Sequence, residues 1–126
     1  MASTTPSSAE QDYLEAIEGL IETKGYAKVV EIAERLNLKG SSVTRMIQKL
    51  ARNGFLKYEK YRGITMTEAG RKTALEMKHR HKLLRNFLIE IGVDAKTADD
   101  DAEGMEHCVS RKTLAHLEKW LEKQRV

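Results

Sequence analysis

The stretch VVEIAERLNLKGSSVTRMIQKL, residues 29–50, decides how this chain folds. Its first eight residues and its last ten residues each carry apolar side chains at helical spacing. Between them, residues 37–40 contain Asn and Gly, which favour turns. Ser41 and Ser42 are typical caps for the second helix. The stretch therefore predicts two short helices joined by a tight turn, which is a helix-turn-helix.

A β-hairpin is predicted directly after these two helices. Residues 55–59 have the composition of a strand, residues 60–63 form a turn, and residues 64–66 form the returning strand. A hairpin in this place is a wing, so the front of the chain is predicted to be a winged helix-turn-helix.

The rest of the chain is predicted to be helical, so the fold class is mostly α. A first helix covers residues 9–23, with Ser8 and Gln11 as a capping box and Gly25 as its end. Behind the wing we expect helices over residues 68–91, 95–108 and 111–124, with Ser110 capping the last one. The predicted organisation is a disordered tail (1–7), a winged helix-turn-helix domain (8–70) and a helical domain for metal binding and dimerisation (71–126).

Length and composition exclude several classes of protein. With 126 residues, the chain is too short for a barrel enzyme or a two-half dinucleotide-binding fold. It has no run of 18 apolar residues and no basic-then-apolar leader, so we expect a cytoplasmic protein that does not cross a membrane. The single cysteine, Cys108, excludes an internal disulfide framework and is more typical of a buried structural thiol than of a reactive one.

Charge is distributed unevenly along the chain. Residues 24–62 contain ten basic and three acidic residues, an excess of seven positive charges. Residues 94–107 contain six acidic residues and one lysine, an excess of five negative charges. The basic front indicates a polyanionic partner. The acidic back indicates either cation binding or simply a solvated helix face.

The second helix of the predicted pair has the residues needed to read duplex DNA. Its hydroxyls and N-terminal amides suit phosphates, while Arg45 and Gln48 suit the edges of guanine and adenine. Charged three-helix units also serve protein contacts, and surface lysines are often only solubilising, so that alternative stays open. The predicted DNA contacts are Lys39, Ser41, Ser42, Thr44, Arg45, Gln48, Lys49, Lys60 and Arg62.

Carboxylates and histidines at helical spacing suggest a metal site. Glu103, Glu106 and His107 stand at i, i+3 and i+4, so they share a face of the predicted fifth helix. Asp12 and Glu15 share a face of the first helix in the same way. Such pairs are usually solvated surface. Together with His81, however, these residues provide enough donors for one or two divalent ions.

The motifs found so far resemble the diphtheria-toxin-repressor family of metal-dependent transcription regulators, in particular its manganese transport regulators. The resemblance runs over residues 12–110, nearly the whole chain. The stretches that carry it are DYLEAI (12–17), ETKGYA (22–27), SSVT (41–44), YEKYRG (58–63) and EGMEH (103–107).

The resemblance implies a set of metal ligands and a preferred metal. The implied ligands are Asp12, Glu15, His81, Glu103, Glu106 and His107. In the iron-responsive branch, a Met stands in place of Asp12 and a Cys in place of Glu103. Hard oxygen donors at both positions favour Mn²⁺, with one or two ions per subunit. Fe²⁺, Co²⁺, Cd²⁺ or Zn²⁺ are further candidates for binding in vitro, since intrinsic affinity ranks Co²⁺ and Zn²⁺ above Mn²⁺.

The resemblance also implies a homodimeric repressor that binds a palindromic operator. Metal would fix the spacing of the two DNA-reading heads, and excess Mn²⁺ would silence genes for its own uptake. We expect no SH3-like third domain and no small organic substrate. The apolar residues predicted for the core or dimer interface are Phe87, Leu88, Ile91, Leu114, Leu117, Trp120 and Leu121.

Three alternative functions differ in what they require of the chain. A di-metal carboxylate enzyme needs Glu-x-x-His on two helices, yet Glu106 follows Glu103 at that spacing and Val109 follows Glu106. A regulator of the same fold that senses iron or zinc would differ in its activating ion. A pure protein-interaction module would bind no DNA in a salt-dependent way.

Overall fold

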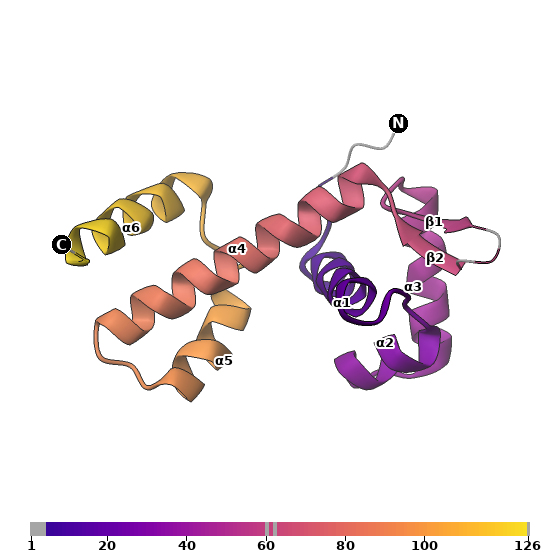
Figure 1. Ribbon diagram of the computed structural model, residues 1–126, viewed down its shortest axis with the longest axis horizontal. Coiled ribbons are helices and arrows are strands. Elements are labelled where there is room, and N and C mark those ends of the chain that lie inside the picture. Colours follow the sequence, from indigo (N-terminus) through magenta and orange to yellow (C-terminus); the bar gives the residue numbers. More distant parts are fainter. Residues whose placement is uncertain (1–4, 60, 62, 126) are drawn as a thin grey trace. The chain divides into compact units, whose positions relative to one another are not determined.

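The computed structural model describes residues 5–59, 61 and 63–125. Within these residues the chain forms six helices and one two-stranded sheet (Figure 1). This confirms the predicted mostly helical fold with a winged helix-turn-helix. The elements are α1 (Ser8–Lys24), α2 (Val29–Leu36), α3 (Gly40–Arg52), β1 (Leu56–Glu59), β2 (Gly63–Met66), α4 (Glu68–Glu90), α5 (Ala95–Met105) and α6 (Arg111–Gln124).

The chain divides into two compact units, with the boundary between Leu75 and Glu76 inside α4. The first unit contains α1, α2, α3, the hairpin and the first turns of α4. The second unit contains the rest of α4 together with α5 and α6. Each unit has its own apolar core, so each is described by itself below.

Helix α1 begins with a capping box one residue earlier than the sequence predicts. The Ser7 hydroxyl accepts the Glu10 amide at 3.1 Å, and the Glu10 carboxylate accepts the Ser7 amide at 2.8 Å. The predicted box at Ser8 and Gln11 is therefore wrong, because the Glu10 carboxylate is the group that reaches back, where a negative charge suits the helix dipole. Ser7, assigned by the sequence to a disordered tail, is this cap. Gly25 ends the helix as predicted, at a φ of 83°.

Helices α2 and α3 form the predicted helix-turn-helix. Asn37 ends α2 in the left-handed conformation, with φ 56°. Helix α3 starts at Gly40, because the Val43 amide already bonds the Lys39 carbonyl at 3.1 Å. The prediction that Ser41 and Ser42 cap this helix is wrong, since both lie inside its first turn and Lys39 is the N-cap without a side-chain hydrogen bond.

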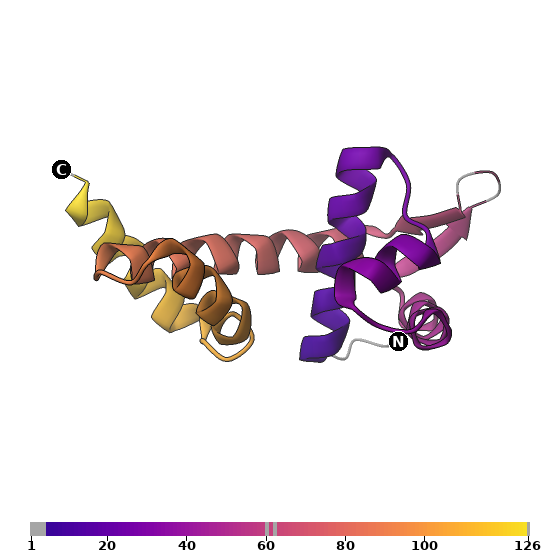
Figure 2. The same cartoon turned by 90° about the horizontal axis from the view of Figure 1, so that it is seen from below.

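The hairpin pairs Leu56 with Met66 and Glu59 with Gly63, and its two strands run together away from the helices (Figure 2). Its base is tied to the start of α4, where the Thr67 hydroxyl donates to the Gly54 carbonyl at 2.6 Å. The apolar core beneath it joins α1, α2, α3 and both strands. Its largest fully buried members are Leu14, Ile17, Ile32, Val43, Ile47 and Leu50.

In the second unit, α5 and α6 both lie along the later part of α4 (Figure 1). Their shared core contains Leu83, Leu84, Ala102, Leu114 and Leu121. Helix α6 has the predicted bounds, and the Ser110 side chain accepts the Thr113 amide as the predicted cap.

Helix α5 ends at Met105, three residues before the predicted end. The cause lies on α4. The Arg80 guanidinium donates to the carbonyls of Glu106 and Val109, at 3.0 and 2.7 Å. Because these carbonyls have a partner outside the helix, residues 106–108 form a turn. Glu106 is therefore the C-cap of α5 and His107 follows it, so of the three residues predicted for one helix face only Glu103 lies within the helix.

The residues predicted for a core or dimer interface differ in burial, and two of them, Phe87 and Leu117, are partly buried against the core of the second unit. Leu88, Leu114 and Leu121 are buried within the second unit. Ile91 and Trp120 remain 55% and 37% exposed, and Trp120 packs edge-on against Phe87 with ring centroids 5.6 Å apart. Among the described residues, no helix combines the length and the apolar character needed to cross a membrane.

Candidate metal centre and nucleic-acid interface

Helix α3 buries one face and exposes the face predicted to read DNA. Val43, Ile47 and Leu50 point into the core of the first unit. The predicted contacts Lys39, Ser41, Ser42, Thr44, Arg45, Gln48 and Lys49 are all exposed. Lys60 and Arg62, predicted at the wing tip, lie outside the described residues.

A basic groove of about 460 Å³ runs beside α3. Its lining includes Tyr13 from α1 together with Arg45, Lys49 and Arg52 from α3. Arg52 is absent from the predicted contacts, although the i, i+4, i+7 spacing of these three cations places them on one helix face. Such a groove suits a phosphate backbone.

Glu10 is a second residue that the sequence did not connect with this interface. Its side chain is buried, and its Oε2 lies 3.7 Å from the Lys49 ammonium. The Ser-x-x-Glu capping signature could have identified Glu10 as a helix start, but only the packing of α1 beside α3 places it next to Lys49.

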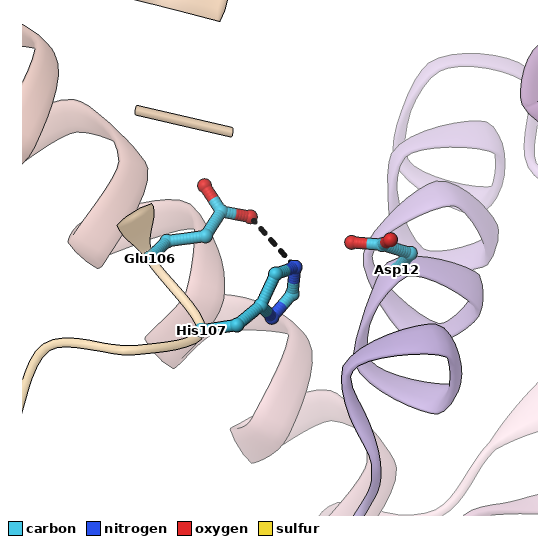
Figure 3. A group of neighbouring side chains, drawn as sticks. All are labelled: Asp12, Glu106 and His107. Atoms are coloured by element: carbon cyan, nitrogen blue, oxygen red, sulfur yellow. Dashed lines mark ion pairs between the residues drawn. The ribbon is translucent and has the colours of Figure 1, made fainter. Parts of the chain in front are cut away.

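Three of the predicted metal ligands meet within the second unit. The Nδ1 atom of His81, on α4, lies 2.8 Å from the Oε2 atom of Glu106. The Nε2 atom of His107 lies 3.9 Å from the other oxygen of the same carboxylate. Figure 3 shows Glu106 and His107 with this ion pair, and also labels Asp12 on α1 of the first unit. Glu106 is fully buried, so both imidazoles approach a carboxylate that is shielded from water.

The other predicted ligands are placed differently. Glu103 lies on α5 with an exposed side chain. Asp12 and Glu15 are half-buried on α1, one turn apart, in the first unit.

Asp99 lies next to His81, and the sequence did not predict it as part of the site. Its Oδ1 atom is 2.8 Å from the Nε2 atom of His81 and 3.4 Å from the Nε atom of Arg85. Asp99 stands four residues before Glu103 and seven before Glu106. This spacing places Asp99 on the same side of α5 as these two residues. The sequence could not show, however, that this face meets His81 on α4.

The pKa values of this pair follow from the contacts. Burial alone lowers the pKa of His81, but the hydrogen bonds to Asp99 and Glu106 outweigh it and raise the pKa above its ordinary value. The hydrogen bond from His81 in turn lowers the pKa of Asp99. The two hydrogen bonds therefore favour the protonated form of His81, whose charge partly balances that of the two carboxylates.

The donors present fit a hard divalent cation. A buried carboxylate and two imidazoles offer oxygen and nitrogen atoms, and Glu106 and His107 each present a ligand atom within 4.8 Å of the other. Carboxylate oxygen suits Mn²⁺, whereas imidazole suits a wider range of metals. Cys108 is exposed and follows His107 directly, which differs from the buried thiol that the sequence predicts.

Two family descriptions match nearly the whole chain. Residues 6–64 match the iron dependent repressor, N-terminal DNA binding domain. Residues 67–126 match the iron dependent repressor, metal binding and dimerisation domain.

Two curated relatives carry the same name. The HTH-type transcriptional regulator MntR of Bacillus pumilus (strain SAFR-032) is 51% identical over 114 residues, covering 90% of this chain and 78% of that protein. The protein of the same name from Lysinibacillus sphaericus (strain C3-41) is 49% identical over 112 residues, covering 89% and 81%. These relatives are transcriptional regulators and not enzymes.

Solved structures share the fold. One described as a manganese-dependent transcriptional repressor in complex with manganese has a TM-score of 0.81 at 34% identity, covering 90% of this chain and 52% of that one. The manganese regulator SloR has a TM-score of 0.81 at 28% identity, covering 94% and 55%. The chain thus spans about half the length of these two solved proteins.

Proposed function

The chain belongs to the iron-dependent repressor family, and from that premise we propose that it is a manganese-responsive transcriptional repressor. The observation that carries the proposal is the buried Glu106 carboxylate between His81 and His107, in the same chain as an exposed, basic recognition helix. The DNA-binding role is assigned to residues 8–70, and metal binding and dimerisation to residues 71–126.

The proposed metal ligands come from both units. His81, Glu106 and His107 are supported by their mutual distances. Asp12 and Glu15 are proposed to complete the site from α1, and Glu103 to join from α5 by turning its exposed side chain. Bound Mn²⁺, as one or two ions per subunit, supplies the positive charge that these carboxylates need to lie together. Fe²⁺, Co²⁺, Cd²⁺ and Zn²⁺ remain the competing ions for this donor set.

The proposed partner is duplex DNA bound by a homodimer. Helix α3 enters the major groove, where Arg45 and Gln48 contact base edges. The exposed hydroxyls of Ser41, Ser42 and Thr44 contact phosphates at its start. A single recognition helix reads one half-site, so two subunits related by a two-fold axis read a palindromic operator. Such a protein acts in the cytoplasm, where the chromosome lies.

Metal and DNA binding are coupled through the spacing of the two recognition helices. In the proposed switch, ligands from α1 and from the second unit close on the same ions and favour the geometry that fits the operator. Because the coupling is reciprocal, operator DNA must tighten Mn²⁺ binding by the same factor. The resemblance to manganese transport regulators implies that the controlled genes serve metal uptake.

The proposal is tested by selecting operators from random duplexes in the presence of MnCl₂ and then measuring their affinity by fluorescence anisotropy. We expect a palindromic consensus. We also expect chelation to weaken binding at least tenfold, which is a loss of about 1.4 kcal/mol of binding free energy. Equal affinity with MnCl₂ and with chelator would refute the switch. Stronger activation by Fe²⁺ or Zn²⁺ than by Mn²⁺ would instead assign the chain to a different metal.

A further inference from the structure

We propose that Asp99 is a positioning residue of the metal centre, which holds the Nε2–H of His81 so that His81 binds the ion through Nδ1. The inference rests on the proposed function, since it assigns a role around the same ion. It concerns only residues of the second unit.

The imidazole of His81 lies between two carboxylates. Its Nδ1 atom is 2.8 Å from Glu106 and its Nε2 atom is 2.8 Å from Asp99. A neutral imidazole has one nitrogen that carries a proton and one that carries a free lone pair. Since Glu106 faces Nδ1, an ion held by Glu106 would take the lone pair of Nδ1, and Nε2 would keep its proton for Asp99.

Asp99 is itself held in place. The Nε atom of Arg85 lies 3.4 Å from the same Oδ1 atom that contacts His81. The Asp99 side chain is 57% exposed and lies across the imidazole ring from Glu106, so it supports His81 and does not share its ion. A carboxylate that accepts the second N–H of a metal-binding histidine fixes the ring orientation and increases the basicity of the ligand.

The neighbouring acid provides a matched comparison. Asp100 also belongs to the acidic run of α5, but its carboxylate pairs with Lys96 at 3.0 Å, one turn back along the same helix. The contact with His81 therefore distinguishes Asp99 from an ordinary solvated acidic face.

The first arm of the test measures Mn²⁺ affinity in the full chain, from the free Mn²⁺ signal in electron paramagnetic resonance. Asp99→Ala is expected to weaken binding by about 10- to 100-fold, and Asp99→Asn by less, because an amide oxygen still accepts the Nε2–H. Asp100→Asn is expected to bind as the wild type does. Circular dichroism of the metal-free variants confirms that the fold is retained.

The second arm identifies the bound nitrogen. In wild-type protein with ¹⁵N-labelled histidine and ¹¹³Cd²⁺, we expect the metal to couple to Nδ1 of His81, with the signal assigned by its loss in His81→Gln. Coupling through Nε2, or an Asp99→Ala variant that binds Mn²⁺ as tightly as the wild type, would overturn the inference while leaving the proposed function intact. A wild-type protein that binds no Mn²⁺ would overturn both.

Discussion

Replacing Glu106 with glutamine removes one negative charge from the metal centre and changes almost nothing in size. Glu106 is fully buried and lies 2.8 Å from Nδ1 of His81. Since glutamine has nearly the same shape, the variant leaves no cavity, and any effect reports on the lost charge. We expect the variant to lose stability without metal and to lose most of the stabilisation that Mn²⁺ provides.

The magnitude has two parts. Removing one partner from a buried ion pair costs about 3–5 kcal/mol, and we expect the lower end here because His81 is partly exposed and keeps Asp99. Metal adds the second part. At a free Mn²⁺ concentration of about 100 times the dissociation constant, binding stabilises the wild type by about 2.7 kcal/mol. If the variant binds about 100-fold more weakly, the same concentration adds only about 0.4 kcal/mol.

The assay is urea unfolding with and without MnCl₂, followed by the fluorescence of Trp120. This is the single tryptophan of the chain, and it packs against Phe87 in the second unit, so its signal reports on that unit. Asp101→Asn, on the exposed side of α5, is the control for removing one acid. A Glu106→Gln variant that gains as much from MnCl₂ as the wild type and the control would refute the ligand assignment.

Three further predictions address other parts of the molecule. Gly70→Ala should cost about 1–3 kcal/mol in urea unfolding, because a Cβ there would lie 2.1 Å from the Phe55 carbonyl oxygen, and an unchanged midpoint would contradict that close approach. Glu10→Gln keeps the capping box but removes the negative charge that lies 3.7 Å from the Lys49 ammonium. With Lys49 free to neutralise one more phosphate, DNA affinity should rise, and a plot of log affinity against log salt concentration should steepen by about 0.9 per subunit. An unaltered slope would count against this. The pKa of His81 is raised in the folded protein, so in the absence of metal this residue stabilises the fold fully below pH 6.5 and loses that effect as the pH rises through its folded-state pKa. The free energy of unfolding from urea titrations between pH 5.5 and 8.5 should show this decline in the wild type and not in His81→Gln.

The order and type of the elements could be predicted because local patterns determine them. Helix α2 has the predicted bounds, and α6 begins behind the predicted Ser110 cap. In both, the apolar spacing and the flanking residues act over only one or two turns. The hairpin follows from the same kind of information, since its turn residues separate two short strand-forming runs.

The helix ends that were predicted wrongly depend on competition or on distant contacts. At α1, two overlapping patterns offer a capping box, and the carboxylate of Glu10 forms it in preference to the amide of Gln11. At α5, the end depends on Arg80, which lies 26 residues before Glu106 and captures its carbonyl. No local pattern in α5 contains that information.

The candidate site shows the same division. His81, Glu106 and His107 were predicted from residue spacing and from motif resemblance, and both histidines lie beside the buried carboxylate of Glu106. Asp99 and Arg85 were not predicted, because each is an ordinary charged residue on its own helix. Their part in the site exists only where α4 and α5 pack together.

In the proposed switch, ligands from both units bind the same ion, and metal binding thereby sets the position of the recognition helix. The most direct test is a crystal structure of the Mn²⁺-loaded protein, with anomalous differences measured above and below the manganese absorption edge. We predict a manganese peak bound by His81, Glu106 and His107 together with Asp12 or Glu15 of α1. A peak whose ligands all come from the second unit, or no peak at this carboxylate, would contradict the account.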